Sequence, residues 1–293
     1  MPGHGDHWGA LCEIDAYLRE KLPRDCREGK LAGQAPCMDV QHGTARVEQV
    51  ACLRRGSERL ASQVLVVSDS TNDSHYLFSG YPVALDGIVH RVTIERIAPW
   101  QYGIEGWIHG TITAAKVPFT FFDTMFFMHS DRLHRGQQVD FSLAGLAYQL
   151  RPIRVRSFKI SDGPMWERER ERRLDEGETP ERAARPVELR MTGAAIFLPC
   201  EDEDCDEAQF QGVIEALDVF EHDGQKIYRM EIVVMRPGDD ELKLPVFASE
   251  WVLEGYVPRL GEDVEGAMWV QGRKVGAENT RVAKTEIENI RIA

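Results

Sequence analysis

The sequence has no long hydrophobic run. No stretch approaches the about 20 consecutive apolar residues that a membrane-spanning helix needs, although 43% of the residues are hydrophobic. Residues 1–20 have neither a basic start nor an apolar core, so they do not resemble a secretory signal peptide. We therefore expect no membrane partner and a cytoplasmic location. The 293 residues are enough for about two domains.

Cysteine is also scarce, with six residues in the whole chain. This number is too small for a fold built on disulfides, and we expect most of the thiols to be reduced. Cys200 and Cys205 enclose an acidic run, but a calcium loop of the EF-hand type would need glycine and glutamate where Glu207 and Val213 stand. Structural zinc would need two more ligands nearby. We therefore predict neither a metal ion nor another cofactor.

Catalytic and nucleotide-binding motifs are absent. The chain contains no GxSxG, HExxH, P-loop or GxGxxG pattern. Their absence removes the usual evidence for an enzyme without excluding one, and we assign no catalytic residue. If the protein is an enzyme with an unrecognised site, His109, Asp123 and His129 are the first residues to examine.

Positive charge is lacking in the last third of the chain. The net charge is −13, of which residues 1–95 carry −3 (10 basic, 13 acidic), residues 96–186 carry +2 (14 basic, 12 acidic) and residues 187–293 carry −12 (11 basic, 23 acidic). An acidic surface repels phosphate backbones and attracts basic ones. The charge therefore disfavours nucleic acid as a partner and favours a protein.

What the sequence does contain is β patterning, clearest in the last third. Turn signals at 222–224 and 237–239 separate three β-rich runs, and in the middle run Tyr228 and Met230 alternate with charged residues, as in a half-buried strand. A short helix-like piece and two further candidate strands follow, the last within 280–292. This element order resembles the OB-fold, a five-stranded Greek-key barrel. The resemblance covers about residues 210–293 and depends on no diagnostic motif.

The stretch 116–139 resembles 243–264. Aligning Pro118 with Pro245 and Gly136 with Gly261 requires a gap of two residues. A structural duplication and a chance recurrence of short apolar patterns both remain open. The five phenylalanines between 119 and 127 are interpreted as core.

The predicted fold class is mainly β (β-rich α+β), with two OB-like β-barrels after a short helical N-terminal segment. Residues 8–22 have helical spacing of apolar residues, 23–43 are turn-rich and predicted irregular, and 44–60 fit a helix or a strand equally well. The predicted division is 1–60 helical or irregular, 61–160 first barrel, 161–186 charged linker helix, and 187–293 second, acidic barrel.

One candidate binding surface is aromatic. Trp107 and His109 would share the outer face of a strand whose other face is apolar, and Trp100 and Tyr102 come just before it. Barrels of the OB type stack nucleic-acid bases on such side chains. The alternative is that this face packs against the N-terminal region.

A second candidate surface is basic. In residues 151–159, Arg154, Arg156 and Phe158 would lie on one face of a strand, as in a groove that follows a nucleic-acid backbone. A solvated edge strand guarded by charges has the same composition. From all this we expect a non-enzymatic adaptor that holds a protein partner. The alternatives are a single-stranded nucleic-acid-binding protein acting through the first barrel, or an enzyme.

Overall fold

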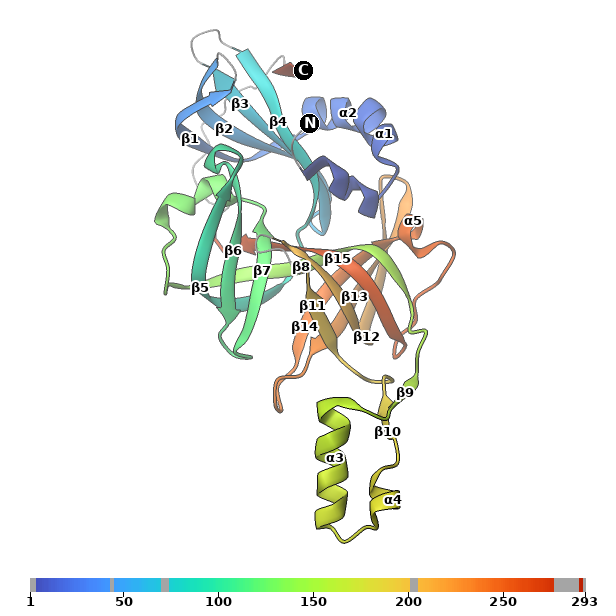
Figure 1. Ribbon diagram of the computed structural model, residues 1–293. Coiled ribbons are helices and arrows are strands. Elements are labelled where there is room, and N and C mark those ends of the chain that lie inside the picture. The colour runs from blue at the N-terminus through green and yellow to red at the C-terminus, as the bar shows by residue number, and fades with distance from the viewer. Residues whose placement is uncertain (1–3, 43–44, 70–73, 201–204, 277–289, 292–293) are drawn as a thin grey trace.

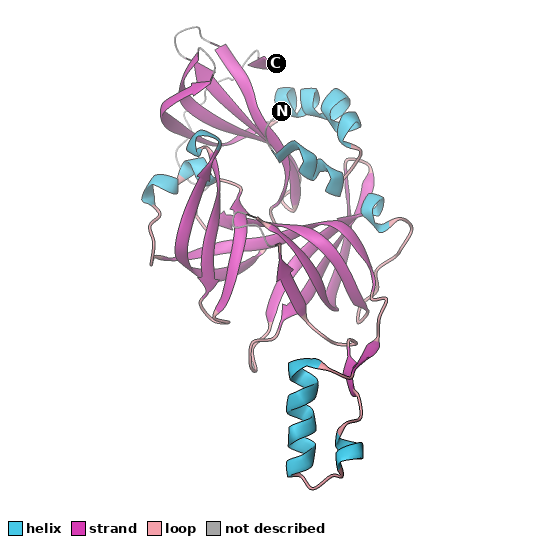
Figure 2. Cartoon of the chain, in the orientation of Figure 1, coloured by secondary structure: helices cyan, strands magenta, loops and turns pink. Residues whose placement is uncertain are grey.

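The computed structural model describes residues 4–42, 45–69, 74–200, 205–276 and 290–291. The chain is mainly β, which confirms the predicted fold class, and the helices lie at the margins of the sheets (Figure 2). The strands are β1 Lys30–His42, β2 Ala45–Gly56, β3 Leu60–Asp69, β4 Ser74–Ala84, β5 Ile88–Trp100, β6 Glu105–Ile112, β7 Val117–Asp123, β8 Gln138–Pro152, β9 Ser157–Ile160, β10 Val187–Arg190, β11 Ile196–Pro199, β12 Glu207–His222, β13 Gln225–Met235, β14 Leu242–Ser249, β15 Asp263–Lys274 and β16 Ile290–Arg291. The helical segments are η1 His4–Ala10, α1 Ile14–Ala16, η2 Tyr17–Lys21, α2 Leu22–Glu28, η3 Gln101–Gly103, η4 Phe126–Met128, η5 Ser130–Arg132, α3 Gly163–Asp175, α4 Pro180–Ala183 and α5 Glu250–Leu253.

A nine-stranded sheet closes into two rings that share β8 and β15. The first ring follows the order β5-β6-β7-β15-β8 and returns to β5, whereas the second follows β12-β13-β14-β8-β15 and returns to β12. The side chains inside both rings form one apolar core. Strands from the predicted ranges 61–160 and 187–293 thus belong to one sheet, and the domain boundaries themselves stay a prediction.

Each ring is completed by one strand of the other: β15 belongs to the first ring as well, and β8 belongs to the second. The pairing of β7 with β15 joins Phe122 to Gln271, and the pairing of β14 with β8 joins Phe247 to Leu146. Phe247 follows Phe122 by 125 positions, and Gln271 follows Leu146 by the same number. Both pairings are parallel, whereas β8 and β15 run antiparallel. The second ring is closed by the pairing of β12 with β15, and most of the strand predicted within 280–292 falls on residues that the structure does not describe. Residues 277–289 lie outside the described residues, and β16 pairs with β4 in another sheet.

The two rings repeat the same backbone hydrogen bonds. The amide of Gly136 donates to Ile94 at 2.7 Å, and the amide of Gly261 donates to Ile214 at 2.8 Å. Both β5 and β12 carry a register irregularity directly after these isoleucines. The similarity of 116–139 to 243–264 is therefore structural. The predicted two-residue gap is wrong, because the constant offset places Pro118 opposite Lys243.

The N-terminal sheet consists of β1 to β4 and β16. Residues 30–42 were predicted irregular but form β1, and 45–56 form the strand alternative rather than the helix. Among the described strands, β1 pairs with β2 and no other, and its register shifts at Gly33 and Pro36. An edge strand tolerates glycine, proline and bulges, so turn-like residues do not exclude a strand here.

A second apolar core lies between the N-terminal region and the outer faces of both rings. Polar contacts cross this boundary: Gln63 Nε2 donates to the Thr124 carbonyl at 2.6 Å, and Gln271 Nε2 donates to the Pro82 carbonyl at 2.8 Å. Gln271 Oε1 also accepts the Ala84 amide at 2.9 Å. These buried amide side chains satisfy backbone groups that the sheets leave unpaired.

Residues 161–186, predicted as a charged linker helix, contain α3 and α4. Both helices lie between β9 and β10 in the chain. These two strands pair to form a stalk, and the helices project from the rest of the chain at its end (Figure 1). The expected pairing of Glu169 with Arg173 is present at 3.0 Å.

Candidate functional site

The aromatic face of β6 has the orientation expected from its alternation. Ile108 points into the first ring and is fully buried, whereas Trp107 lies on the opposite face. That face is covered, because Trp107 packs against the second apolar core beside the N-terminal sheet. The Trp100 and Trp107 ring centroids are 5.4 Å apart. The alternative of packing against the N-terminal region therefore describes Trp107 better than a base-stacking platform.

His109 and Tyr102 are placed differently from Trp107. The His109 ring is hydrogen-bonded on both nitrogens, with Nε2 2.9 Å from Arg96 and Nδ1 3.0 Å from the Thr120 hydroxyl. Tyr102 is 56% exposed in η3 and forms an edge contact with the Phe78 ring. Of the four aromatic-face residues predicted as ligand-binding, Tyr102 is the one with a well-exposed ring.

The basic segment is not a single strand face, which corrects the sequence prediction. Arg154 and Arg156 lie in the loop between β8 and β9, and Phe158 lies in β9 with 43% of its surface exposed. The Ile153 amide donates to the carbonyl of Asp263, the first residue of β15, so β8 has no further partner on that strand beyond this point and the chain leaves the sheet. This stalk is far from β6 (Figure 1). The structure therefore does not bring the aromatic and basic residues together.

Asp123 and His129, two of the three residues considered for catalysis, form a buried pair. Asp123 Oδ2 lies 2.6 Å from His129 Nε2, and Asp123 Oδ1 accepts the Met125 amide at 3.0 Å. The two side chains are 1% and 2% exposed, respectively. His109 is not part of this pair. The arrangement ties the end of β7 to η4 and η5, and it presents no group to solvent.

Two buried carboxyl groups carry no signal in the sequence. Burial raises the pKa of Glu105 to about 7, against a smaller opposing effect of the Ser79 hydroxyl. Burial also raises the pKa of Asp206 to about 6, while hydrogen bonds from Trp269 and Trp107 lower it. Asp206 accepts Trp269 Nε1 at 2.6 Å. Asp206 directly follows the acidic run between Cys200 and Cys205, and it is 7% exposed.

Cys200 and Cys205 form a disulfide, whereas Cys12, Cys26 and Cys52 are free thiols. Their Cα atoms are 6.0 Å apart because the chain turns back between β11 and β12. The acidic residues 201–204, weighed as part of a calcium loop, lie outside the described residues. Within the part of the chain that the structure describes, no three His, Cys, Asp or Glu side chains gather as a metal site.

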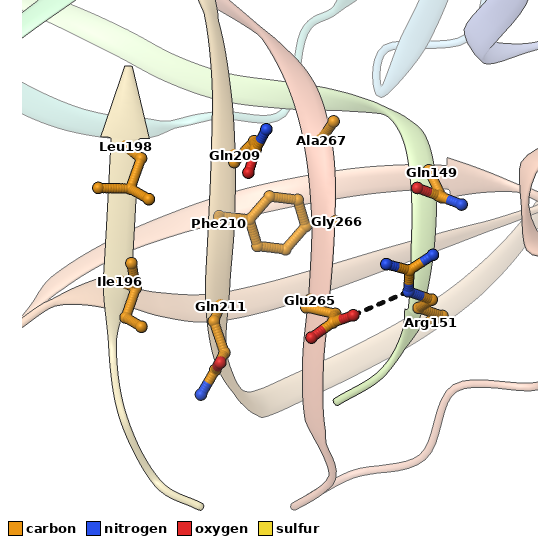
Figure 3. Close-up of a pocket in the computed structure, with 10 residues that line it drawn as sticks. All are labelled: Gln149, Arg151, Ile196, Leu198, Gln209, Phe210, Gln211, Glu265, Gly266 and Ala267. Atoms are coloured by element: carbon orange, nitrogen blue, oxygen red, sulfur yellow. Dashed lines mark hydrogen bonds and ion pairs between the residues drawn. The ribbon is translucent and has the colours of Figure 1, made fainter. Parts of the chain in front are cut away.

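A groove of about 330 Å³ crosses β11, β12, β15 and β8 (Figure 3). Arg151 and Glu265 form an ion pair of 2.8 Å along one wall, and Leu198 is 57% exposed on the other. Phe210 is only 3% exposed, so the groove offers no stacking surface. The lining residues are Gln149, Arg151, Ile196, Leu198, Gln209, Phe210, Gln211, Glu265, Gly266 and Ala267.

The segment after β14 exposes apolar side chains that sequence reasoning missed. Trp251 is 54% exposed, Val257 55% and Leu260 65%, and we call these three residues the α5 patch. Val252 and Leu253 of α5 are buried in the ring core instead. Trp251 lies in α5, whereas Val257 and Leu260 lie in the loop that follows, where no alternation in the sequence separates a buried face from an exposed one.

No protein-family model matches the chain, and no curated protein or solved structure is significantly similar to it. None of the described helices has the length and apolar character needed to cross a membrane.

Proposed function

We propose that the protein is a non-enzymatic adaptor that holds a protein partner through the α5 patch. The observation that carries the proposal is the exposure of Trp251, Val257 and Leu260 within ten consecutive residues. Large aromatic and aliphatic side chains at a surface are typical anchors of protein interfaces.

The charges around the patch favour a basic partner. The segment 250–263 holds four acidic residues and one basic residue, Arg259, which gives a net charge of −3. This segment belongs to the third of the chain that carries −12. An acidic rim around apolar anchors speeds the encounter with a basic surface and disfavours an acidic one.

The equivalent segment of the first ring supports this assignment. There η4 packs against β1 of the N-terminal sheet, and Met125 and Met128 are buried in the second core. In the first ring, the segment between the third and fourth strands thus packs against an extended strand, β1. We infer that the partner presents an extended basic segment with apolar anchors, bound across α5.

The test uses a labelled peptide of alternating lysine and leucine, titrated by fluorescence anisotropy at physiological ionic strength. We expect binding that Trp251→Ser/Leu260→Ser weakens by about tenfold or more. The matched control is Val89→Ser/Val275→Ser, which removes two apolar side chains of similar exposure (56% and 51%) elsewhere. A peptide of alternating glutamate and leucine should not bind.

Two results would contradict the proposal. Equal binding by both double variants would show that general charge attraction explains the affinity. A dimer in sedimentation experiments that Trp251→Ser/Leu260→Ser converts to a monomer would show that a second copy of the chain, not another protein, covers the patch.

A second candidate function is supported by the exposure of Arg154 and Arg156 in the loop before β9 and of Phe158 in β9. We infer that any binding of single-stranded nucleic acid would involve this stalk rather than Trp107. Residues 151–159 hold four cationic groups, of which Arg151 is paired with Glu265, so the slope of log affinity against log salt would be no steeper than about −3. A strand titrated at two salt concentrations, with Arg154→Ala/Arg156→Ala against Trp107→Phe, tests this alternative.

We also propose that the protein is cytoplasmic and that its two rings are OB-like barrels. The order of strands in each ring supports the OB-like interpretation. Cys12, Cys26 and Cys52 are free thiols, which supports a reducing compartment, and the proposal predicts that Cys200 and Cys205, which are paired here, are reduced in the cell. Thiol labelling of the protein in intact cells would decide the location independently of the partner.

A further inference from the structure

A pocket of about 450 Å³ lies where the N-terminal sheet meets the first ring. It is separate from the groove of Figure 3 and from the α5 patch. Its volume is within the range of small-molecule sites, which often occur at such boundaries. The lining residues are Gln34, Ala35, Pro36, Val50, Tyr102, Gly103, Ile104, Phe127, Met128, Ser130, Asp131 and Arg132.

The inner wall of this pocket is apolar and tightly held. Val50 and Ile104 are 1% exposed, and Met128 is 6% exposed. A Cβ atom at Gly33 would lie 3.2 Å from Met128 Sδ and closer still to Met125, so β1 presses directly against these methionines. The pocket is therefore bounded by packed elements, which favours a site that exists before a ligand arrives.

Tyr102 stands at the mouth of the pocket in an unusual backbone conformation. Its φ of 61° and ψ of 19° lie in the left-handed region, which bulky residues rarely adopt. Its side chain is 56% exposed. Such residues persist where the surroundings force them, and they gather at ligand sites. The equivalent turn of the second ring has the same conformation at Asp223, so the fold imposes it, and its consequence here is an exposed aromatic ring at the mouth of the pocket.

One cation is fixed at the rim. A guanidinium nitrogen of Arg132 donates to the carbonyl of Met128, which lines the pocket. Asp131 also lines the pocket, 3.6 Å from Arg132 Nε, and its side chain is more exposed (81%) than that of Arg132 (66%). The remaining polar lining side chains, Gln34, Ser130 and Tyr102, are neutral. Apolar walls with one anchored guanidinium suit a ligand that has an apolar body and a single anionic head.

We propose that this pocket binds an amphipathic carboxylate. The apolar body packs against Val50, Ile104 and Met128, and the carboxylate pairs with Arg132. This activity is independent of the α5 patch.

The experiment measures decanoate binding to the full chain by calorimetry, with decanol and decyltrimethylammonium as probes of the same chain length. We expect decanoate to bind best. Arg132→Gln should weaken decanoate about fivefold, as expected for an exposed ion pair, and should leave decanol unchanged. Arg135→Gln is the matched control, because Arg135 is exposed in the same loop and does not line the pocket.

A second variant, Ala35→Phe, fills the pocket and should abolish binding of decanoate and decanol. Its thermal unfolding is compared with that of the wild type to show that it folds, and Trp251→Ser checks that the α5 patch is not the binding site. The proposal is overturned if the wild type does not bind decanoate, if decyltrimethylammonium binds more tightly, or if Arg132→Gln and Arg135→Gln bind decanoate equally. Because Arg132 lies at the surface, these results do not depend on whether Ala35→Phe folds.

Discussion

The two rings share their hydrogen-bonding pattern but differ in what covers the segment after their third strand. In the first ring, Met125 and Met128 face β1 of the N-terminal sheet and are buried. In the second ring, α5 buries Val252 and Leu253 in the ring core and leaves Trp251 outside. The same backbone plan therefore yields one connection closed by the chain itself and one that stays exposed.

A second difference lies beneath the N-terminal region. The pairings of β6 with β7 and of β13 with β14, together with the offset between β7 and β14, make Glu105 equivalent to Ile227. Both side chains are buried, at 1% and 0% exposure. The first ring thus keeps a carboxyl group where the second has a hydrocarbon. Strand pairing can therefore stay the same while one buried position holds an apolar side chain in one ring and an ionisable side chain in the other.

The largest expected effect comes from truncating the covered connection. Met125→Ala should lower the free energy of unfolding by about 2 to 5 kcal/mol, because it removes a fully buried side chain and leaves a cavity. Trp251→Ala, at the exposed connection, should change it by no more than about 0.5 kcal/mol. Urea unfolding of the two variants measures the contrast. Equal losses would show that α5 is covered in solution.

The contrast also shows what the sequence could predict. The alternation in 225–235 and the turns at 222–224 and 237–239 identified the strands of the second ring, because side-chain period and turn residues are local properties. The sharing of β8 and β15 depends on pairing between residues more than a hundred positions apart, and no local pattern encodes it. The prediction instead completed the second ring with a later strand.

The candidate site was harder to predict than the fold. The outer face of β6 was assigned correctly to Trp107. The N-terminal sheet that covers this face was not expected, because β1 lies in a turn-rich segment that was predicted to be irregular. Arg154 and Arg156 were placed on a strand because alternation continues past the point where β8 ends. Tyr102 was selected for its aromatic ring, whereas its left-handed backbone is visible only in three dimensions.

The second prediction concerns Glu105 and the pH dependence of stability. Burial raises its folded pKa to about 7 from an ordinary value of 4.5. The unfolded chain therefore loses this proton first as the pH rises, and the folded state loses stability between pH 4.5 and 7. Glu105→Gln removes this loss, so the variant should gain up to about 3 kcal/mol over the wild type by pH 8, and little near pH 4.5.

The measurement is urea unfolding of the wild type and Glu105→Gln at several pH values. The difference between the two proteins is the informative quantity, because buried histidines act in the opposite direction: burial lowers the pKa of His7 to about 3, which costs stability as the pH falls below 6.5. Ile227→Val, at the equivalent position of the second ring, should cost a constant amount of about 1 kcal/mol at every pH. A difference for Glu105→Gln that stays constant with pH would show that Glu105 is hydrated.

The smallest expected effect concerns the turns that join the first two strands of each ring. Both turns contain two successive residues with positive φ, Tyr102-Gly103 in the first ring and Asp223-Gly224 in the second. Aspartate and asparagine tolerate this conformation, and tyrosine does not. Tyr102→Asn should therefore raise the free energy of unfolding by about 1 kcal/mol, measured by urea unfolding. The matched change Asp223→Asn keeps the tolerated backbone but breaks the ion pairs with Arg24 and Arg55, at 2.9 and 2.8 Å, so it should destabilise. A loss of stability in Tyr102→Asn would mean that the packing of its ring on Phe78 outweighs the backbone strain.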